Sequence, residues 1–305
     1  MKKIRIISRK SELALWQANF VKEQLNKYYP DVEVEIIGVT TSGDKILDKA
    51  LDKIGGKGLF IKELENGLLA DTADIAVHSL KDLPAKLNEA FKLAAVLKRE
   101  DAADAFVSNK YANLESMPEA AVIGTSSARR VAIIKQHYPQ LQIKLLRGNI
   151  QTRLNKLDSG EYDAIILAVA GLKRLNLANR ITQRLDIDKF IPAIGQGALA
   201  IEILSTRTDL IDYLKPLEDD DTALEVNVER MLGSQLGASC SVPIAIYAKI
   251  TADKLSLNAM LWDIEGNHYC HSHIQMDKSK YKEIVSHCLN ELYKYGAKEI
   301  MLKYL

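Results

Sequence analysis

Cysteine, aromatic residues and long apolar runs are all scarce in this chain of 305 residues. Its three cysteines, Cys240, Cys270 and Cys288, are too few and too scattered for a disulfide framework, and they lack the paired spacing of a zinc site. No stretch approaches the roughly 18 consecutive apolar residues that a membrane-spanning helix requires. We therefore expect reduced thiols, no metal and no membrane partner.

An excess of either charge sign is also missing, because 41 Lys and Arg face 40 Asp and Glu. The net charge of +1 and the 6% aromatic content argue against a nucleic-acid partner. The opening MKKIRIISRK breaks its apolar run too early for a signal peptide, which favours a cytoplasmic location. Any anion site must therefore be a local concentration of cations.

The apolar pattern is typical of an α/β protein, since short apolar runs alternate with segments of helical period. From about residue 103 the pattern restarts, and a third unit follows the acidic turn at 218–221. We expect domain 1 over 1–98 and 198–216, domain 2 over 103–192, and a small α+β domain over 220–305. The first helix is expected to begin after Ser11 and to end before Pro30.

The remaining expected elements come from the same pattern. Strands are expected over 3–7, 32–39, 73–79, 91–97, 121–125, 142–147, 164–170, 198–204, 243–250 and 255–262. Helices are expected to end at Leu69 and to cover 127–138, 150–158, 222–236 and 278–295. The strand over 198–204 could return to the first sheet, so that two lobes joined by crossing segments leave a cleft between them.

Basic residues gather after the expected strands, where open α/β sheets bind ligands. The pair Arg129-Arg130 lies in the first turn of an expected helix, where the helix dipole disfavours each cation by about 0.3–1 kcal/mol. An external anion would relieve this conflict, and Thr125, Ser126 and Ser127 would add hydrogen-bond donors. Two solvated arginines paired with surface acids are the alternative.

Other candidates also have two interpretations. Asp82 is a functional carboxylate or a turn residue, and His78 is a catalyst or a hydrogen-bonded core residue. Lys57 lies in GGKG, which is not a P-loop because Gly58 follows the lysine; the segment is a mobile flap or a plain glycine turn. Cys240 lies in a small-residue loop that exposes a thiol, or it is buried and inert.

The ordered motifs of this chain resemble the porphobilinogen deaminase family from end to end. The most specific are VHSLKD at 77–82 and GTSSARR at 124–130. They are accompanied by SRKSELALWQA at 8–18, GGKGLFIKELE at 55–65, REDAADAFVS at 99–108, LRGNIQTRLNKLDSGEYDAIILAVAGLKRL at 146–175, PAIGQGALAIE at 192–202 and the Cys240 loop. The resemblance implies a three-domain enzyme whose first two lobes, with mixed, mostly parallel sheets, are similar to type II periplasmic binding proteins.

The resemblance also implies the chemistry. It implies a monomeric transferase that condenses four porphobilinogen molecules, with loss of ammonia, on a dipyrromethane cofactor held by a thioether to Cys240. Asp82 would be the catalytic carboxylate. By similarity, the residues that bind cofactor and substrate carboxylates are Arg9, Ser11, Lys57, Lys81, Thr125, Ser126, Ser127, Arg129, Arg130, Arg147, Arg153 and Arg174.

Two local departures and two rival functions accompany this resemblance. Glu12 occupies the usual proline place, and Gly237-Ala238-Ser239 replaces the commoner Glu-Gly-Gly before the cysteine. A non-catalytic module could capture an anionic ligand in the same cleft without a covalent group. A nucleic-acid binder would need a basic stripe with interleaved aromatic residues.

Overall fold

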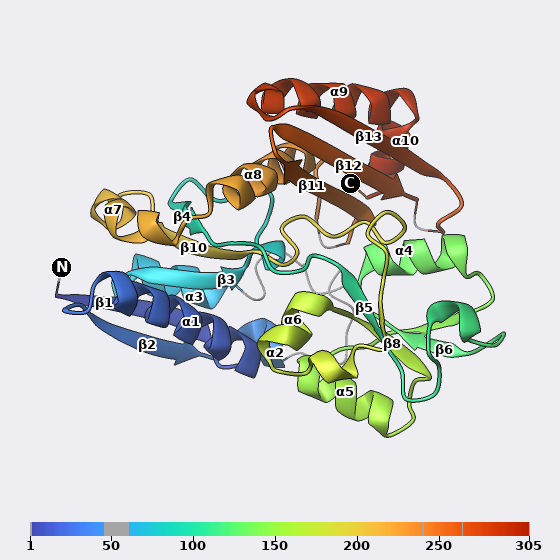
Figure 1. The fold of residues 1–305 in the computed structure, drawn as a ribbon, viewed down its shortest axis with the longest axis horizontal. Helices are drawn as coiled ribbons and strands as arrows, with labels where there is room; N and C mark the ends of the chain where they lie inside the picture. The colour runs from blue at the N-terminus through green and yellow to red at the C-terminus, as the bar shows by residue number, and fades with distance from the viewer. Residues whose placement is uncertain (1, 46–60, 240, 264, 305) are drawn as a thin grey trace.

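Three β-sheets organise the chain in the computed structural model, which describes residues 2–45, 61–239, 241–263 and 265–304. Figure 1 shows the first sheet at the left, the second at the lower right and the third above them. The first two sheets mix parallel and antiparallel strands, and the third is antiparallel. The expected α/β fold with mixed sheets and a small C-terminal α+β unit is confirmed.

The first sheet is built around β1. Its strands are, in spatial order, β2 (Glu33–Val39), β1 (Lys3–Arg9), β3 (Ile75–Ser79), β10 (Leu199–Leu204) and β4 (Phe91–Val96). The strand β1 is parallel to β2 and β3, whereas β10 runs antiparallel between β3 and β4. The strand expected over 198–204, which could return to the first sheet, is therefore found in that sheet as β10.

The second sheet repeats this arrangement. Its order is β7 (Gln142–Lys144), β6 (Val122–Gly124), β8 (Ala164–Ala168), β5 (Asp104–Val107) and β9 (Gln183–Arg184). The strand β6 is parallel to β7 and β8, and β5 is antiparallel to β8 and β9. In both sheets the parallel strands end at one edge, so the loops after β1, β3, β6 and β8 are available for a ligand site.

Amphipathic helices cover these two sheets. The helix α1 (Glu12–Tyr28) begins at its cap Ser11, whose Oγ accepts the Ala14 N–H at 3.4 Å. It buries Ala18, Val21 and Leu25 against the first sheet, and each larger side chain contributes roughly 1.5–3 kcal/mol of burial free energy. The other helices of these two units are α2 (Ser42–Lys45), α3 (Lys62–Leu69), α4 (Ala128–His137), α5 (Ile150–Asp158), α6 (Val169–Arg174) and α7 (Ile211–Leu214).

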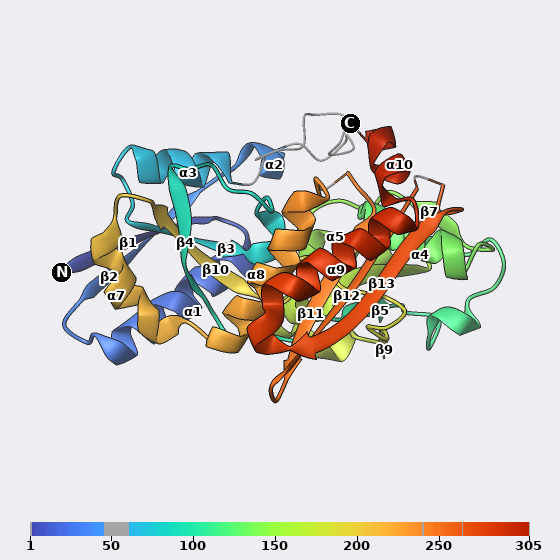
Figure 2. The same cartoon turned by 90° about the horizontal axis from the view of Figure 1, so that it is seen from above.

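The third sheet has the order β11 (Ile244–Thr251), β12 (Lys254–Trp262) and β13 (Tyr269–Asp277). The helices α8 (Asp220–Gln235) and α9 (Tyr281–Lys294) pack on it in one hydrophobic cluster, and α10 (Ala297–Met301) follows (Figure 2). Asp219 caps α8 by accepting the Thr222 N–H at 2.9 Å. None of the helices in the described ranges is long and apolar enough to cross a membrane.

The helix α8 also holds the two segments that cross between the first and second sheets. Glu229 is fully buried and its Oε1 lies 2.7 Å from Arg99 Nη1 in one crossing segment. Its Oε2 accepts the Gly195 N–H of the other at 2.7 Å, and Oε1 accepts the Ala248 N–H of β11 at 2.9 Å. Arg99 Nε donates to the Gln196 carbonyl at 2.8 Å. One carboxylate therefore joins three parts of the protein.

Candidate anion-binding active site

Lys81 and Asp82 lie in a tight 3-10 turn, Leu80–Asp82, directly after β3. Leu80 is buried and its carbonyl accepts the Leu83 N–H at 3.0 Å, which closes the turn. Lys81 is half-buried and Asp82 is exposed. The turn therefore presents one cation and one carboxylate beyond the carboxyl end of the strand.

The start of α4 places the paired arginines of the second sheet. Ser127 caps the helix by accepting the Arg130 N–H at 3.5 Å, and Thr125 Oγ1 accepts the Ser127 N–H at 3.3 Å. Thr125 is buried, and Ser126 and Ser127 are half-buried. Arg129 and Arg130 consequently lie in the first turn, as the sequence predicts.

Both arginines are buried and share one carboxylate, that of Asp104 at the start of β5. Arg129 Nη2 lies 2.7 Å from Asp104 Oδ2, and Arg130 Nη2 lies 2.6 Å from Oδ1. Arg129 is 4% exposed and Arg130 is 5% exposed. The alternative of two solvated arginines paired with surface acids is therefore wrong, because both the arginines and their acid are inside the protein.

Asp104 is an internal counter-charge for the two arginines at the start of α4. Burial would raise the pKa of Asp104, but the charges of Arg129 and Arg130 outweigh it and hold this pKa below its ordinary value. The carboxylate is therefore ionised and neutralises one of the two positive charges. One positive charge of the arginine pair therefore remains for an external anion.

Two further arginines of the second sheet approach the same region. Arg147 is buried in the turn before α5, next to Gly148, whose φ of 110° is accessible to glycine. Arg153 lies on α5, where its Nε donates to the Gly148 carbonyl at 2.8 Å. Burial, followed by the positive charge of Arg130, lowers the pKa of Arg153 to about 10, against the effect of Asp82.

Lys81 and Arg153 show that groups from the two sheets converge. Burial and then the positive charge of Arg130 lower the pKa of Lys81 to about 8, although Asp82 and Asp104 oppose this. The same two charges, of Arg130 and Asp82, therefore act on a lysine of the first sheet and an arginine of the second. Cations repel one another here, so the site favours an anionic ligand.

Arg174, Arg9 and Ser11 lie close to the N-terminal half of α1. Arg174 ends α6, donates to the Gly197 carbonyl at 2.6 Å and lies 5.8 Å from the Trp16 ring of α1. Burial lowers the pKa of Arg174 to about 10. Arg9 is half-buried at the end of β1, opposite Val39 of β2, and Ser11 caps α1. Arg174 therefore lies where α6 packs against α1.

His78 and two of the three cysteines lie among the residues that the structure describes. His78 is buried in β3 with Nε2 2.9 Å from Glu202 Oε2, which matches the hydrogen-bonded core alternative. Cys270 and Cys288 are buried free thiols. Lys57 and Cys240 lie outside the described residues. Among the residues that the structure describes, no His, Cys, Asp and Glu cluster could hold a metal ion.

Asp104 and Gln196 are the functional candidates that the sequence did not reveal. Gln196 Nε2 donates to the Ala102 carbonyl at 2.7 Å and to Asp104 Oδ1 at 2.9 Å. Asp104 lies within the motif REDAADAFVS, and Gln196 lies within PAIGQGALAIE. Nothing in the local pattern marks them, because their partners are distant in the chain.

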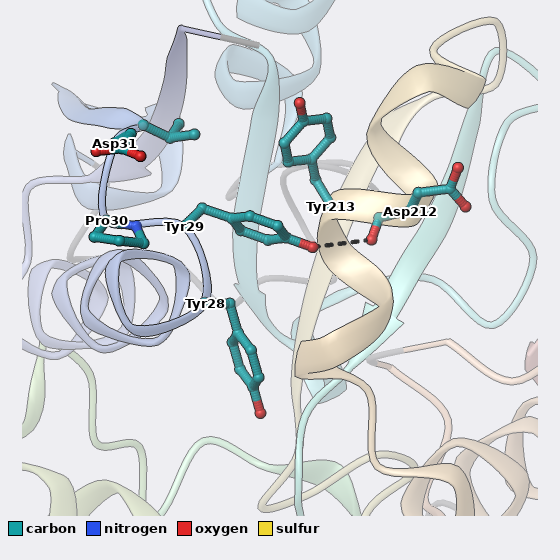
Figure 3. Close-up of a pocket in the computed structure, with 7 residues that line it drawn as sticks. Tyr28, Tyr29, Pro30, Asp31, Asp212 and Tyr213 are labelled. Atoms are coloured by element: carbon teal, nitrogen blue, oxygen red, sulfur yellow. Dashed lines mark hydrogen bonds between the residues drawn. The ribbon is translucent and has the colours of Figure 1, made fainter.

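A separate hollow of about 450 Å³ lies between the end of α1 and α7. Figure 3 shows Tyr29 directed toward Asp212 and Tyr213, with Asp31 at the rim. Its two aspartates have the wrong charge for an acidic ligand. In Figures 1 and 2, α7 lies toward the left end of the protein and α4 toward the right, so this hollow is away from the arginine pair at the start of α4.

Comparisons with known proteins decide the family. The description "Porphobilinogen deaminase, dipyromethane cofactor binding domain" matches residues 4–212, and "Porphobilinogen deaminase, C-terminal domain" matches residues 223–294. The chain belongs to the porphobilinogen deaminase family. A porphobilinogen deaminase from Burkholderia vietnamiensis is 54% identical over 263 residues, which are 86% of this chain and 79% of the relative. A Burkholderia thailandensis relative is also 54% identical, over 86% of this chain and 80% of its own.

Solved structures of other proteins show a more distant likeness. A putative methionine-binding lipoprotein from Bacillus subtilis has a TM-score of 0.46 at 12% identity and covers 77% of this chain and 95% of its own. A nutrient-binding protein from Burkholderia cenocepacia bound to methionine has a TM-score of 0.45 at 11% identity, over 76% and 96%. At these scores the likeness says nothing about the ligand of this chain.

The described residues fit the dipyrromethane cofactor of the porphobilinogen deaminase family. Each pyrrole of this group carries an acetate and a propionate, so it requires several cations at one place. The region around Asp82 supplies them from two sheets. In addition, the buried Nε atoms of Arg129 and Arg130 have no hydrogen-bond partner in the described part of the chain. A buried donor without an acceptor is costly, so a ligand carboxylate nearby would stabilise this pair.

Proposed function

We propose that this chain is hydroxymethylbilane synthase, a transferase that condenses four porphobilinogen molecules stepwise and releases a linear tetrapyrrole by hydrolysis. We further propose that it works as a cytoplasmic monomer with domains over 1–98 plus 198–216, 103–192 and 220–305. The family membership supports the reaction, and the basic region between the first and second sheets supports the substrate class.

The convergence of cations around Asp82 is the observation that carries the proposal. Lys81 follows a strand of the first sheet, whereas Arg130 and Arg153 belong to the second, yet the charge of Arg130 acts on both Lys81 and Arg153. A chain that gains two carboxylates with each added pyrrole needs such a concentration of cations. The nearly neutral protein as a whole does not provide it.

Asp82 is suited to the chemical step. Loss of ammonia from the aminomethyl group of porphobilinogen leaves an electron-deficient azafulvene. The exposed carboxylate of Asp82, held in a turn between basic groups, would stabilise positive charge on a pyrrole nitrogen and accept its proton. When bound, the dipyrromethane supplies the free pyrrole position to which new units are added.

The basic and hydroxyl side chains bind and orient the carboxylates in this proposal. Lys81, Arg130 and Arg153 would hold acetates and propionates near Asp82. The same role is proposed for Arg9, Ser11, Lys57, Thr125, Ser126, Ser127, Arg129, Arg147 and Arg174. Cys240 would act once, as the nucleophile whose sulfur forms the thioether to the cofactor.

Intact-mass measurement of the purified protein tests the function and the attachment residue together. We expect an adduct of dipyrromethane size that is absent from Cys240→Ser and retained in Cys270→Ser, since Cys270 is a buried thiol of the third sheet. An active protein with unmodified Cys240 would contradict the attachment. A wild-type protein that does not convert porphobilinogen would contradict the function.

The Asp82→Asn variant tests the catalytic carboxylate. Asp82 is exposed, so we expect an unfolding temperature equal to that of the wild type. Removal of a general acid–base group is expected to lower turnover by about 10²–10⁴-fold. Tetrapyrrole formation at the wild-type rate would remove Asp82 from the mechanism.

A further inference from the structure

We propose that Asp104 is a positioning residue for the anion site: it fixes Arg129 and Arg130 side by side and ties them to the segment that joins the two large sheets. This inference rests on the proposed function, because it assigns the arginine pair a ligand carboxylate. Asp104 itself is fully buried, so in this proposal it acts through the two arginines.

Three donors converge on the Asp104 carboxylate. Oδ2 accepts from Arg129 Nη2 at 2.7 Å, and Oδ1 accepts from Arg130 Nη2 at 2.6 Å and from Gln196 Nε2 at 2.9 Å. These are short, charge-assisted bonds in a place without solvent, where such contacts are strongest. The carboxylate is therefore a rigid centre rather than one member of a mobile surface pair.

Each guanidinium has a second fixed contact on its other Nη atom. Arg129 Nη1 donates to the Ile191 carbonyl at 2.7 Å, and Arg130 Nη1 donates to the Ile166 carbonyl at 2.8 Å. With both Nη atoms bound, neither planar group can rotate. The Nε side of each arginine remains without a hydrogen-bond partner among the described residues. The contacts with Asp104, Ile191 and Ile166 thus fix the orientation of both guanidinium groups.

Asp104 also sets the charge of the pair. Two buried guanidinium groups at a helix start would repel each other and the helix dipole, and one carboxylate reduces their summed charge to a single positive unit. Lys81 experiences the charges of Arg129, Arg130 and Asp104 together. The loss of the carboxylate would therefore alter the whole basic region and not only its two direct partners.

The contacts extend to the crossing segment over 191–198. Ile191 accepts from Arg129 and Gln196 donates to Asp104, so this segment is bound both to an arginine of the pair and to the carboxylate that the pair shares. Gln196 is in turn linked to Arg99 through its carbonyl. A change in the position of either large sheet would consequently shift Asp104 and the two arginines that it binds.

Asp74 provides a matched control in the first sheet. Its carboxylate also lies between two arginines, with Oδ2 3.0 Å from Arg5 Nε and Oδ1 2.9 Å from Arg207 Nη1, and Asp74 is 7% exposed. The Asp74 carboxylate binds Arg5 and Arg207, neither of which belongs to the proposed site. Asp104→Asn and Asp74→Asn therefore remove the same charge from the same kind of triad, one at the site and one away from it.

The experiment compares wild-type, Asp104→Asn and Asp74→Asn proteins by intact mass, thermal unfolding and steady-state kinetics with porphobilinogen. We expect incomplete cofactor loading and about 100-fold lower kcat/KM in Asp104→Asn, mainly through KM, since small misplacement of binding groups has effects of this size. Asp74→Asn is expected to lose thermal stability but to load fully with wild-type KM. Equal loading and KM in the two variants would overturn the proposal.

A milder variant, Gln196→Met, tests the proposal even where Asp104→Asn does not fold. It keeps the volume and the arginine charges but removes one donor to Asp104, and we expect about tenfold higher KM with nearly unchanged kcat. Wild-type KM and loading in Gln196→Met would overturn the positioning role. An inactive wild-type protein would instead refute the proposed function, so the two failures are distinct.

Discussion

The Glu229→Gln substitution gives a quantitative test of the contact that joins the three parts of the protein. Glu229 accepts from Arg99 and from the backbone N–H groups of Gly195 and Ala248. A glutamine has one carbonyl oxygen, so its amide nitrogen must face one of these N–H donors. Glu225, whose Oε2 lies 3.7 Å from Arg99 Nη1, would then supply the counter-charge for Arg99.

The expected loss follows from the burial of both partners. The Arg99 side chain is 5% exposed and that of Glu229 is 0% exposed. Removal of one partner of such a pair costs about 3–5 kcal/mol of unfolding free energy. The entropy of unfolding is about 2.1 cal/mol/K per residue, which gives about 0.64 kcal/mol/K for 305 residues. The unfolding temperature should therefore fall by about 5–8 °C.

Differential scanning calorimetry provides the assay, with the wild type, Glu229→Gln, Arg99→Met, the double variant and one control variant. The double variant should lose about 1–3 kcal/mol less than the sum of the single losses, because both single changes break the same pair. Lys249→Met is the control, since its ammonium group is exposed to solvent, and its loss from the pair with the buried Glu225 should cost less than the loss of a partner from the fully buried pair. Additive losses, or a fall in Glu229→Gln no larger than in Lys249→Met, would refute the reasoning.

Three further outcomes are expected. In apoprotein, Lys81 loses its charge as pH rises through about 8, so the rate of cofactor loading should fall above that pH in wild type but not in Lys81→Arg, as measured by intact mass; parallel profiles would contradict this. Gly197→Ala should lose about 2–4 kcal/mol in urea unfolding, because a Cβ at φ 90° would meet the Glu100 carbonyl; a loss below about 0.5 kcal/mol would show that the loop relaxes. The two arginines beside Asp74 outweigh its burial and lower its pKa, so its stabilisation is present above pH about 4 and is lost as pH falls through the lowered value. Asp74→Asn should consequently lose about 1–3 kcal/mol at pH 7, and this difference from the wild type should vanish in acid.

The sequence predicts the elements whose signals are local. The cap Ser11 and the stop before Pro30 bound α1 correctly, and the helix over 150–158 is found as α5. The expected strand over 164–170 ends at Ala168, because Val169 already begins α6. Local caps and apolar periodicity are sufficient for these elements, whereas the point at which a buried strand becomes a helix depends on packing.

Strands without an apolar signature are missed. The strand β13 directs Cys270 and Ser272 inward, and a small polar residue at a buried position hides the alternation. The four residues of β5 include the buried Asp104, and β9 has only two residues. These strands form because neighbouring strands offer backbone partners, which a single-sequence pattern does not contain.

The candidate site is predicted in its members but not in its internal connections. The loops after strands identify Lys81 and the arginine pair, since ligand sites occur at those strand ends. The shared carboxylate is 25 residues from Arg129, and its side chain is indistinguishable in the sequence from any other aspartate. Only the folded chain shows that Asp104 already supplies part of the counter-charge that was expected from an external anion.

The antiparallel strand β10 has a consequence for synthesis on the ribosome. The second sheet has all its strands once residue 184 has been made, whereas the first sheet waits for residue 204. Until then β3 and β4 leave open edges that can pair with other chains. The unit around the second sheet can therefore fold while the unit around the first sheet is still incomplete. The nascent protein is most prone to aggregate just before β10 emerges.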